Sequence, residues 1–129
     1  MGLKHMIITV LTLVIWACSN QSADMYEASD LSLMMREMVE WSKEAKQKLD
    51  RGERIHEVPA HFFQLARQKS TRNEHEEEAF QAMVPSYLDA LKGIERKDSQ
   101  EFYYNASIQA CKNCHHIYCG GPMSIIEQL

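Results

Sequence analysis

Hydrophobic positions recur at helical spacing along most of the chain. The clearest pattern runs from about Tyr26 to Arg51, where apolar residues three and four positions apart share one face and charged residues lie largely on the other. The apolar face consists of Leu31, Met34, Met35, Met38, Trp41, Ala45 and Leu49. This pattern predicts an amphipathic helix with Ser29 or Asp30 as its N-cap and Gly52 at its end.

Two further helices are expected in the middle of the chain. Pro59 can open a short second helix that continues through Ala66, because proline is tolerated in a first helical turn. A third helix is expected from about Glu74 to Glu95, and Pro85 inside it predicts a kink or a split. Its apolar side consists of Phe80, Met83, Val84, Tyr87, Leu88, Leu91 and Ile94.

A fourth helix is expected near the carboxyl end, capped by Asp98 or Ser99. Its inward face consists of Tyr104, Ile108, Cys111, His115 and Tyr118. The pattern Gly120-Gly121-Pro122 is expected to end it, after which the apolar residues Ile125, Ile126 and Leu129 can fold back as a short cover.

Few turn residues interrupt these patterns, and the glycines that mark turns are Gly52, Gly93, Gly120 and Gly121. No alternating strand pattern or internal repeat is visible. Four helices with short connections predict an all-α antiparallel four-helix bundle over residues 26–129.

The first seventeen residues have the order of a secretory signal: Lys4 and His5, then an apolar run from Met6 to Trp16, then Ala17. That run is shorter than the roughly 20 apolar residues that span a bilayer. Ile15-Trp16-Ala17-Cys18 is similar to a bacterial lipobox, which predicts cleavage after residue 17 and lipidation of Cys18. Residues 18–25 then form a polar tether, and the protein is expected on the bacterial cell envelope, facing the periplasm or the exterior. Ordinary secretion or an uncleaved anchor with a free Cys18 thiol are the alternatives.

The net charge of −4 at pH 7 excludes a nucleic-acid binder of the usual basic kind. The four cysteines lie at the signal junction and between Cys111 and Cys119, which is not the distribution of a disulfide framework.

Cys111-Lys112-Asn113-Cys114-His115 is the attachment signature of c-type haem. Two thiols three positions apart on a helix can bond the two vinyl groups of one haem, and the imidazole that follows then lies below the iron. Export supplies the compartment in which this attachment takes place. We therefore expect one covalent haem c, held by Cys111 and Cys114 and with His115 as the proximal iron ligand.

Three other interpretations of the cysteines are open. Cys111 and Cys114 could form a thioredoxin-like redox pair, although no strand-helix alternation surrounds them. Together with His115 or His116 and Cys119 they could bind zinc, which would require the helix to break. A plain disulfide between them would be strained at this helical spacing.

In these residues the chain resembles the cytochrome c-prime and c556 family of periplasmic four-helix bundles, whose haem motif lies on the last helix. After the histidine, the family's motif continues with any two residues, then a tyrosine, then Arg or Lys. Tyr118 matches the tyrosine of this motif, whereas Cys119 stands where the motif has a basic residue. The resemblance covers the architecture of the whole mature chain but, in motif, only the last helix and part of the first. The departure at Cys119 removes the basis for carrying over the family's proximal electrostatics and reduction potential. We expect the Cys119 thiol either to pack under the proximal imidazole as a small apolar group or to be reactive.

The resemblance implies that the first helix supplies the residue on the other face of the iron. Met35 aligns best with that distal position, Met38 is the next candidate, and Met34 is the weakest. Methionines on an apolar stripe are also common core filler, so these side chains could simply pack. His56, His61 or His75 could instead give a bis-histidine site, whereas His116 is expected on the surface.

The function implied is single-electron transfer without substrate turnover, between redox partner proteins of the envelope and with the lipid as membrane contact. A gas-binding haem protein with an open distal face is the first alternative, and a zinc or thiol structural module is the second. Dimers are common in the resembled family, which makes a homodimer an expectation of the same origin.

Overall fold

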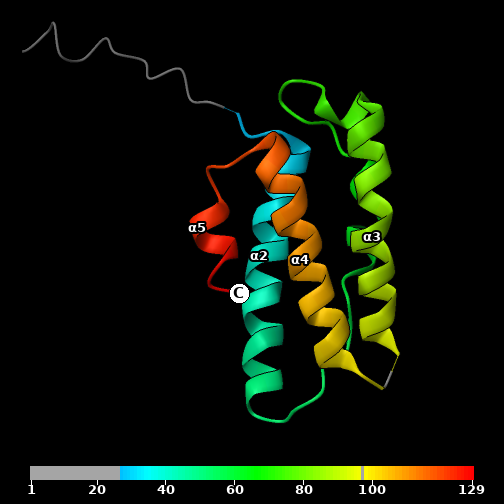
Figure 1. The fold of residues 1–129 in the computed structure, drawn as a ribbon, viewed down its shortest axis with the longest axis vertical. Coiled ribbons are helices and arrows are strands. Elements are labelled where there is room, and N and C mark those ends of the chain that lie inside the picture. Colours follow the sequence, from blue (N-terminus) through cyan, green and yellow to red (C-terminus); the bar gives the residue numbers. More distant parts are fainter. Residues whose placement is uncertain (1–26, 97) are drawn as a thin grey trace, which may run out of the picture.

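The structure, a computed structural model, describes residues 27–96 and 98–129. This part of the chain is all-helical, with four helices of seven residues or more, and is compatible with a helical bundle (Figure 1). Its elements in order are α2 (Asp30–Asp50), the 3-10 helices η1 (Ala60–Arg67) and η2 (Glu74–Glu76), α3 (Glu78–Glu95), α4 (Gln100–Tyr118) and α5 (Met123–Ile126). The predicted signal, tether and lipidation site at Cys18 lie outside the described residues.

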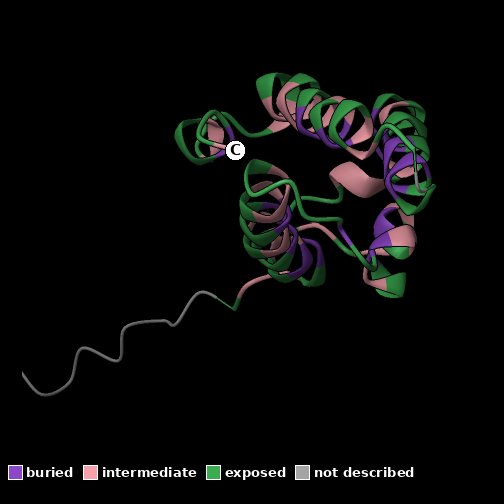
Figure 2. Cartoon of the chain, turned by 90° about the horizontal axis from the view of Figure 1, so that it is seen from below, coloured by how far each residue is buried: buried purple, intermediate pink, exposed green. Residues whose placement is uncertain are grey.

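The elements lie side by side along one axis. In Figure 1, α2 and α3 run in the same direction and α4 runs in the opposite one, while the segment that contains η1 brings the chain back between α2 and α3. The most extensive packing joins α3 to α4, and α2 meets α4 over a smaller area. Buried positions on each helix face the inside of this arrangement and exposed positions face outward (Figure 2).

Helix α2 forms as its amphipathic pattern predicts. Ser29 is its N-cap, and the Ser29 side-chain oxygen accepts a hydrogen bond from the Ser32 amide at 3.3 Å. Of the two alternatives predicted for this cap, Ser29 and Asp30, the first is confirmed. Gly52 follows its end with φ of 69°, a left-handed conformation that glycine adopts without strain. The buried face of α2 consists of Leu31, Met34, Met38, Ser42 and Ala45.

The second and third helices differ from the sequence prediction. The second is a 3-10 helix that begins at Ala60, with Pro59 in the N-cap position. The third does not start at Glu74: residues Glu74–Glu76 form the separate turn η2, because Glu77 is extended (φ −73°, ψ 135°) and α3 begins after it. Pro85 lies inside α3 and does not split it.

Gly93 was expected to mark a turn, and that expectation was wrong. It lies buried within α3, and a Cβ atom there would overlap the ring of Tyr103 on α4. The absence of a side chain lets the two helices approach closely at this point. The guanidinium of Arg96 covers the same ring at 5.1 Å from its centroid.

The segment between α2 and η1 is extended and packed into the core. Ile55 and Val58 are buried. The side-chain amide of Gln100, at the start of α4, forms hydrogen bonds with both the backbone amide and the backbone carbonyl of Ile55. It accepts from the Ile55 amide at 3.0 Å and donates to the Ile55 carbonyl at 2.8 Å. This exchange satisfies backbone groups that would otherwise be buried without partners.

The carboxyl-terminal residues fold back, as predicted. Ile126 of α5 is buried at 3% exposure, and the Tyr104 hydroxyl lies within hydrogen-bonding distance of the Leu129 carbonyl at 3.1 Å and the Ser42 carbonyl at 3.2 Å. Ile125, in contrast, remains about half exposed. Among the helices of the described chain, none is both long enough and apolar enough to cross a membrane.

Candidate cofactor site

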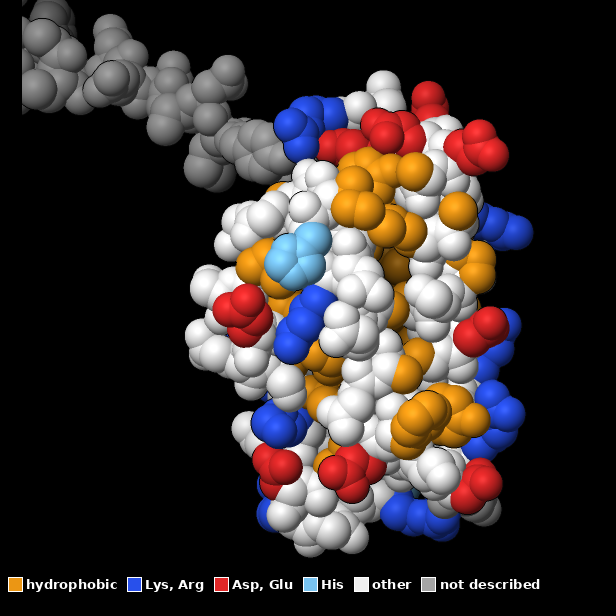
Figure 3. Space-filling view, in the orientation of Figure 1, with side chains coloured by type: hydrophobic (Ala, Val, Ile, Leu, Met, Phe, Trp, Pro, Cys, Tyr) orange, Lys and Arg blue, Asp and Glu red, His pale blue; other side chains and the backbone are white. Residues whose placement is uncertain are grey.

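A cavity of about 710 Å³ lies among α2, α3, α4 and the carboxyl-terminal segment. Its volume falls in the range of small-molecule and cofactor sites, roughly 300–1,000 Å³. Its apolar lining includes Leu31, Met35, Met38, Val39, Leu65, Phe80, Met83, Val84, Ala110, Ile125, Ile126 and Leu129. On the face seen in Figure 3, hydrophobic side chains reach the surface in a line between charged groups gathered toward the ends and edges of the molecule.

One wall of the cavity is the face of α4 that carries the cysteines. Cys111, Cys114, His115 and Tyr118 all line it, as their spacing along one helical face predicts. His116 is exposed and does not line the cavity, in agreement with the prediction of a surface position. The structure therefore brings together the three residues assigned to cofactor attachment and proximal ligation.

The carboxyl end of α4 holds the His115 ring. Its Nδ1 atom lies 2.9 Å from the Cys119 carbonyl oxygen. Because a carbonyl only accepts, Nδ1 must carry the proton in this contact, and Nε2 of the neutral ring keeps its lone pair. A backbone carbonyl on the second ring nitrogen is the usual means of orienting a metal-binding histidine.

The contact from Cys119 differs from the one we predicted. The Cys119 thiol was expected either to pack beneath the imidazole or to be reactive. The prediction that it packs there was wrong, because the side chain is exposed. The residue ends α4 in an extended conformation (φ −156°, ψ 87°), which points its carbonyl at the ring. The contact of Cys119 with the His115 ring is therefore made by its backbone, and the residue also lines the cavity.

Burial sets the chemistry of the two cavity thiols. It raises the pKa of Cys111 to about 12, with the neighbouring Cys114 adding to the rise, and it also raises the pKa of Cys114. A thioredoxin-like pair requires the opposite shift, since its thiolate is the reactive form. Cys111, Cys114 and Cys119 are all free of disulfides.

The wall opposite the cysteines includes two of the three methionines of α2. Met35, partly exposed, and Met38, buried, both line the cavity, whereas Met34 is buried elsewhere in the core. Both cavity methionines come from the predicted first helix, on its side that borders the cavity. The order of preference between them stays a prediction.

The other candidate ligands lie away from the cavity. His56 is exposed, His61 pairs with Glu37 at 3.0 Å, and the Nδ1 atom of His75 contacts Ser70. None of the three lines the cavity. Across residues 27–96 and 98–129, no group of three or more His, Cys, Asp or Glu side chains is arranged to hold a metal ion.

Two tyrosines, Tyr87 and Tyr118, contribute phenol groups to the cavity lining. Tyr87 is buried, and burial raises its pKa well above the ordinary value, so its phenol stays neutral. Tyr118, at the end of α4, packs edge-to-face on Phe80 at 5.9 Å between centroids. Burial and the nearby Glu77 carboxylate raise the Tyr118 pKa.

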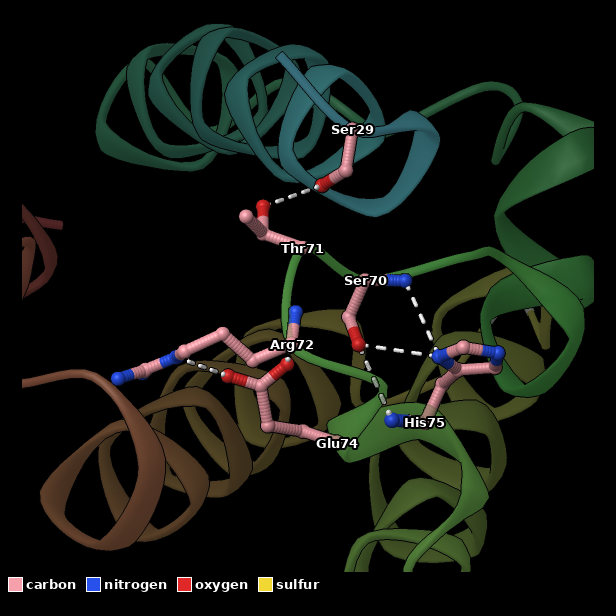
Figure 4. Close-up of polar contacts among 6 residues, drawn as sticks. All are labelled: Ser29, Ser70, Thr71, Arg72, Glu74 and His75. Carbon is pink, nitrogen blue, oxygen red and sulfur yellow. Dashed lines mark hydrogen bonds and ion pairs between the residues drawn. The ribbon is translucent and has the colours of Figure 1, made fainter. Parts of the chain in front are cut away.

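The sequence analysis did not predict that the polar loop between η1 and α3 borders the cavity. Ser70, Thr71, Arg72 and Glu74 all line the cavity, and hydrogen bonds order the loop (Figure 4). The Ser70 amide donates to His75 Nδ1 at 3.1 Å, and the Thr71 hydroxyl donates to Ser29 Oγ at 3.2 Å. Short polar residues between two helical patterns indicate only a loop, and its position over the cavity depends on the packing of the helices.

Comparisons with protein-family models, with curated proteins and with solved structures found no match to this chain. The chemistry of the donor set is therefore the test of the expected cofactor. Two thiols and an oriented imidazole line one wall of an apolar cavity with a thioether side chain on another wall, and this set fits a covalently attached haem.

Proposed function

We propose that this protein is a c-type cytochrome that carries one covalent haem in an antiparallel four-helix bundle and transfers single electrons in the bacterial envelope. The observation that supports it best is the shared cavity wall of Cys111, Cys114 and His115. The attachment motif could occur by chance in a sequence, but a motif on a surface helix would not line a cofactor-sized apolar cavity. Met35 is proposed as the distal ligand, with Met38 as the alternative.

When bound, the haem supplies an iron that cycles between two oxidation states. The chain's own residues would do four things for it. Cys111 and Cys114 would hold the porphyrin through thioether bonds, and His115 would present Nε2 in the tautomer fixed by the Cys119 carbonyl. A methionine thioether from α2 would favour the reduced state, and the apolar lining would exclude water, which limits reorganisation.

The proposed location rests on residues 1–25. Export would bring the chain to the compartment of haem attachment, and lipidation of Cys18 would keep the domain at a membrane through the tether. Redox partner proteins of the envelope would then meet it at the membrane surface. A globomycin-sensitive shift of the full-length chain, lost in Cys18→Ala, would test the lipidation independently of the haem.

The decisive experiment is expression of the full chain with a c-type haem maturation system. We expect a haem that stays with the polypeptide after denaturation and a mass increase of one haem. The double variant Cys111→Ser/Cys114→Ser should lose both signals, and Cys119→Ser is the matched control. A wild-type protein without covalent haem would overturn the proposal.

Gas binding is the second candidate, and the apolar cavity wall favours it. Val39 and Leu31 of α2 line the cavity beside the methionines, so the same wall could leave the iron open. The two functions separate on the optical spectrum. A six-coordinate low-spin haem that resists carbon monoxide supports the carrier, and a high-spin haem that binds it readily supports the alternative.

A further inference from the structure

The border of the cavity carries cationic groups that the attachment motif does not explain. Arg36 on α2 and Arg72 on the loop after η1 both line the cavity. Neither belongs to α4, which carries the cysteines. The lining also includes Lys43, which pairs with Glu40, and Glu74, which pairs with Arg72, so one positive charge in excess remains at this border. An excess positive charge beside an apolar cavity favours a ligand with an anionic part.

The position of Arg72 is fixed by its loop. Its Nε atom lies 2.9 Å from Glu74 Oε1, and its backbone amide donates to Glu74 Oε2 at 3.1 Å. The side chain extends from the loop in the direction opposite to His75 (Figure 4). The guanidinium itself is largely exposed at 73%, and Glu74 engages only its Nε edge, so its terminal amino groups can bind another carboxylate.

Arg36 is available in the same way. It is exposed, and among residues 27–96 and 98–129 it forms no ion pair. The lysine of the lining, Lys43, already contacts Glu40 at 2.8 Å. The two arginines are therefore the groups at this border most able to accept an added carboxylate.

We propose that Arg36 and Arg72 bind the two carboxylates of the ligand, which for a haem are its propionates. This inference rests on the proposed function. A porphyrin bonded to α4 through its vinyl groups has its propionates on the half of the ring away from those bonds, and the two arginines come from elements other than α4. The Ser70–His75 loop acts as the support that presents Arg72, through its contacts to Ser29 and Glu74.

The test is the midpoint potential of the covalently loaded full chain, measured by spectroelectrochemistry from pH 5 to 8. Arg36→Gln and Arg72→Gln should each lower the potential, because an unneutralised propionate favours the oxidised iron. The fall should be larger in the double variant. The propionate ionisation should also move to higher pH, and Arg72→Lys should restore part of both changes.

The matched control is Arg51→Gln. Arg51 forms a similar pair with a glutamate two residues later, at 2.7 Å from Glu53, but it does not line the cavity. The expected falls in potential do not depend on haem content, which is measured separately.

The outcomes distinguish this inference from the proposed function. A covalent haem with potentials and ionisations equal in Arg36→Gln, Arg72→Gln and Arg51→Gln would overturn the propionate assignment and leave the cytochrome proposal standing. A wild-type chain without covalent haem would overturn both.

Discussion

The Nδ1 atom of His115 lies 2.9 Å from the carbonyl oxygen of Cys119, one helical turn further along the chain. This contact uses the backbone of Cys119, and its thiol is exposed. The orientation of the His115 ring therefore depends on how α4 ends.

We expect Cys119→Ser to retain the haem content and spectrum of the wild type, because serine can keep the same backbone conformation and carbonyl. Cys114→Ser should lose one of the two thioether bonds. Haem stain after denaturation and the optical spectrum of the native protein measure both effects. A Cys119→Ser spectrum that differs from the wild type would assign the thiol a role at the iron.

The methionines of α2 give a graded test of the distal side. Met35→Ala should change a low-spin spectrum to a high-spin one and admit carbon monoxide, while Met38→Ala should leave the coordination unchanged. Met34→Ala is the control, since Met34 is buried but does not line the cavity. It should cost about 2–5 kcal/mol of unfolding free energy and leave the spectrum unaltered. If only Met38→Ala opened the iron, the ligand would be Met38.

The close approach of α3 and α4 at Gly93 predicts sensitivity to a single methyl group. Gly93→Ala should lower the free energy of unfolding by about 1–3 kcal/mol, because the new Cβ would overlap the Tyr103 ring. Gly120→Ala, where a Cβ meets nothing within 4 Å, should have little effect. Urea unfolding measures both changes, and a double-mutant cycle with Tyr103→Ala should recover part of the loss. Equal stabilities for the two glycine variants would contradict this packing.

The Glu74 carboxylate predicts an acid-dependent part of the stability. Its own backbone amide, then Ser70 and Arg72, lower its pKa to about 2. Because this folded value lies below the unfolded one of about 4.3, the contribution is fully present above that unfolded value and is lost as the pH falls through about 2. We expect it to be about 1 kcal/mol, given the partial exposure of the pair.

Urea unfolding of the wild type and of Glu74→Gln between pH 2 and 6 measures this contribution. The difference between them should be largest at pH 6 and shrink toward pH 2. Glu95→Gln, at an exposed position on α3, is the control. A difference that stayed constant over this range would show that the carboxylate's charge is not the stabilising feature.

The amphipathic pattern determined the helical class, the extent of α2 and α4, and which α4 residues share a face. It could do so because helical periodicity is local: Cys111, His115 and Tyr118 lie on one face of any α-helix that contains them. The Ser29 cap was visible for the same reason, since a cap bonds to amides only a few residues away.

Features set by distant segments could not be read in this way. The role of Gly93 and the hydrogen bonds between Gln100 and Ile55 each depend on partners brought together by packing. The cavity itself is of this kind, because its walls come from α2, α3 and α4. The sequence by itself determined which residues could hold a haem; only the tertiary structure decided that two thiols, an oriented imidazole and two arginines border one cavity, since volume and long-range contact are properties of packed helices.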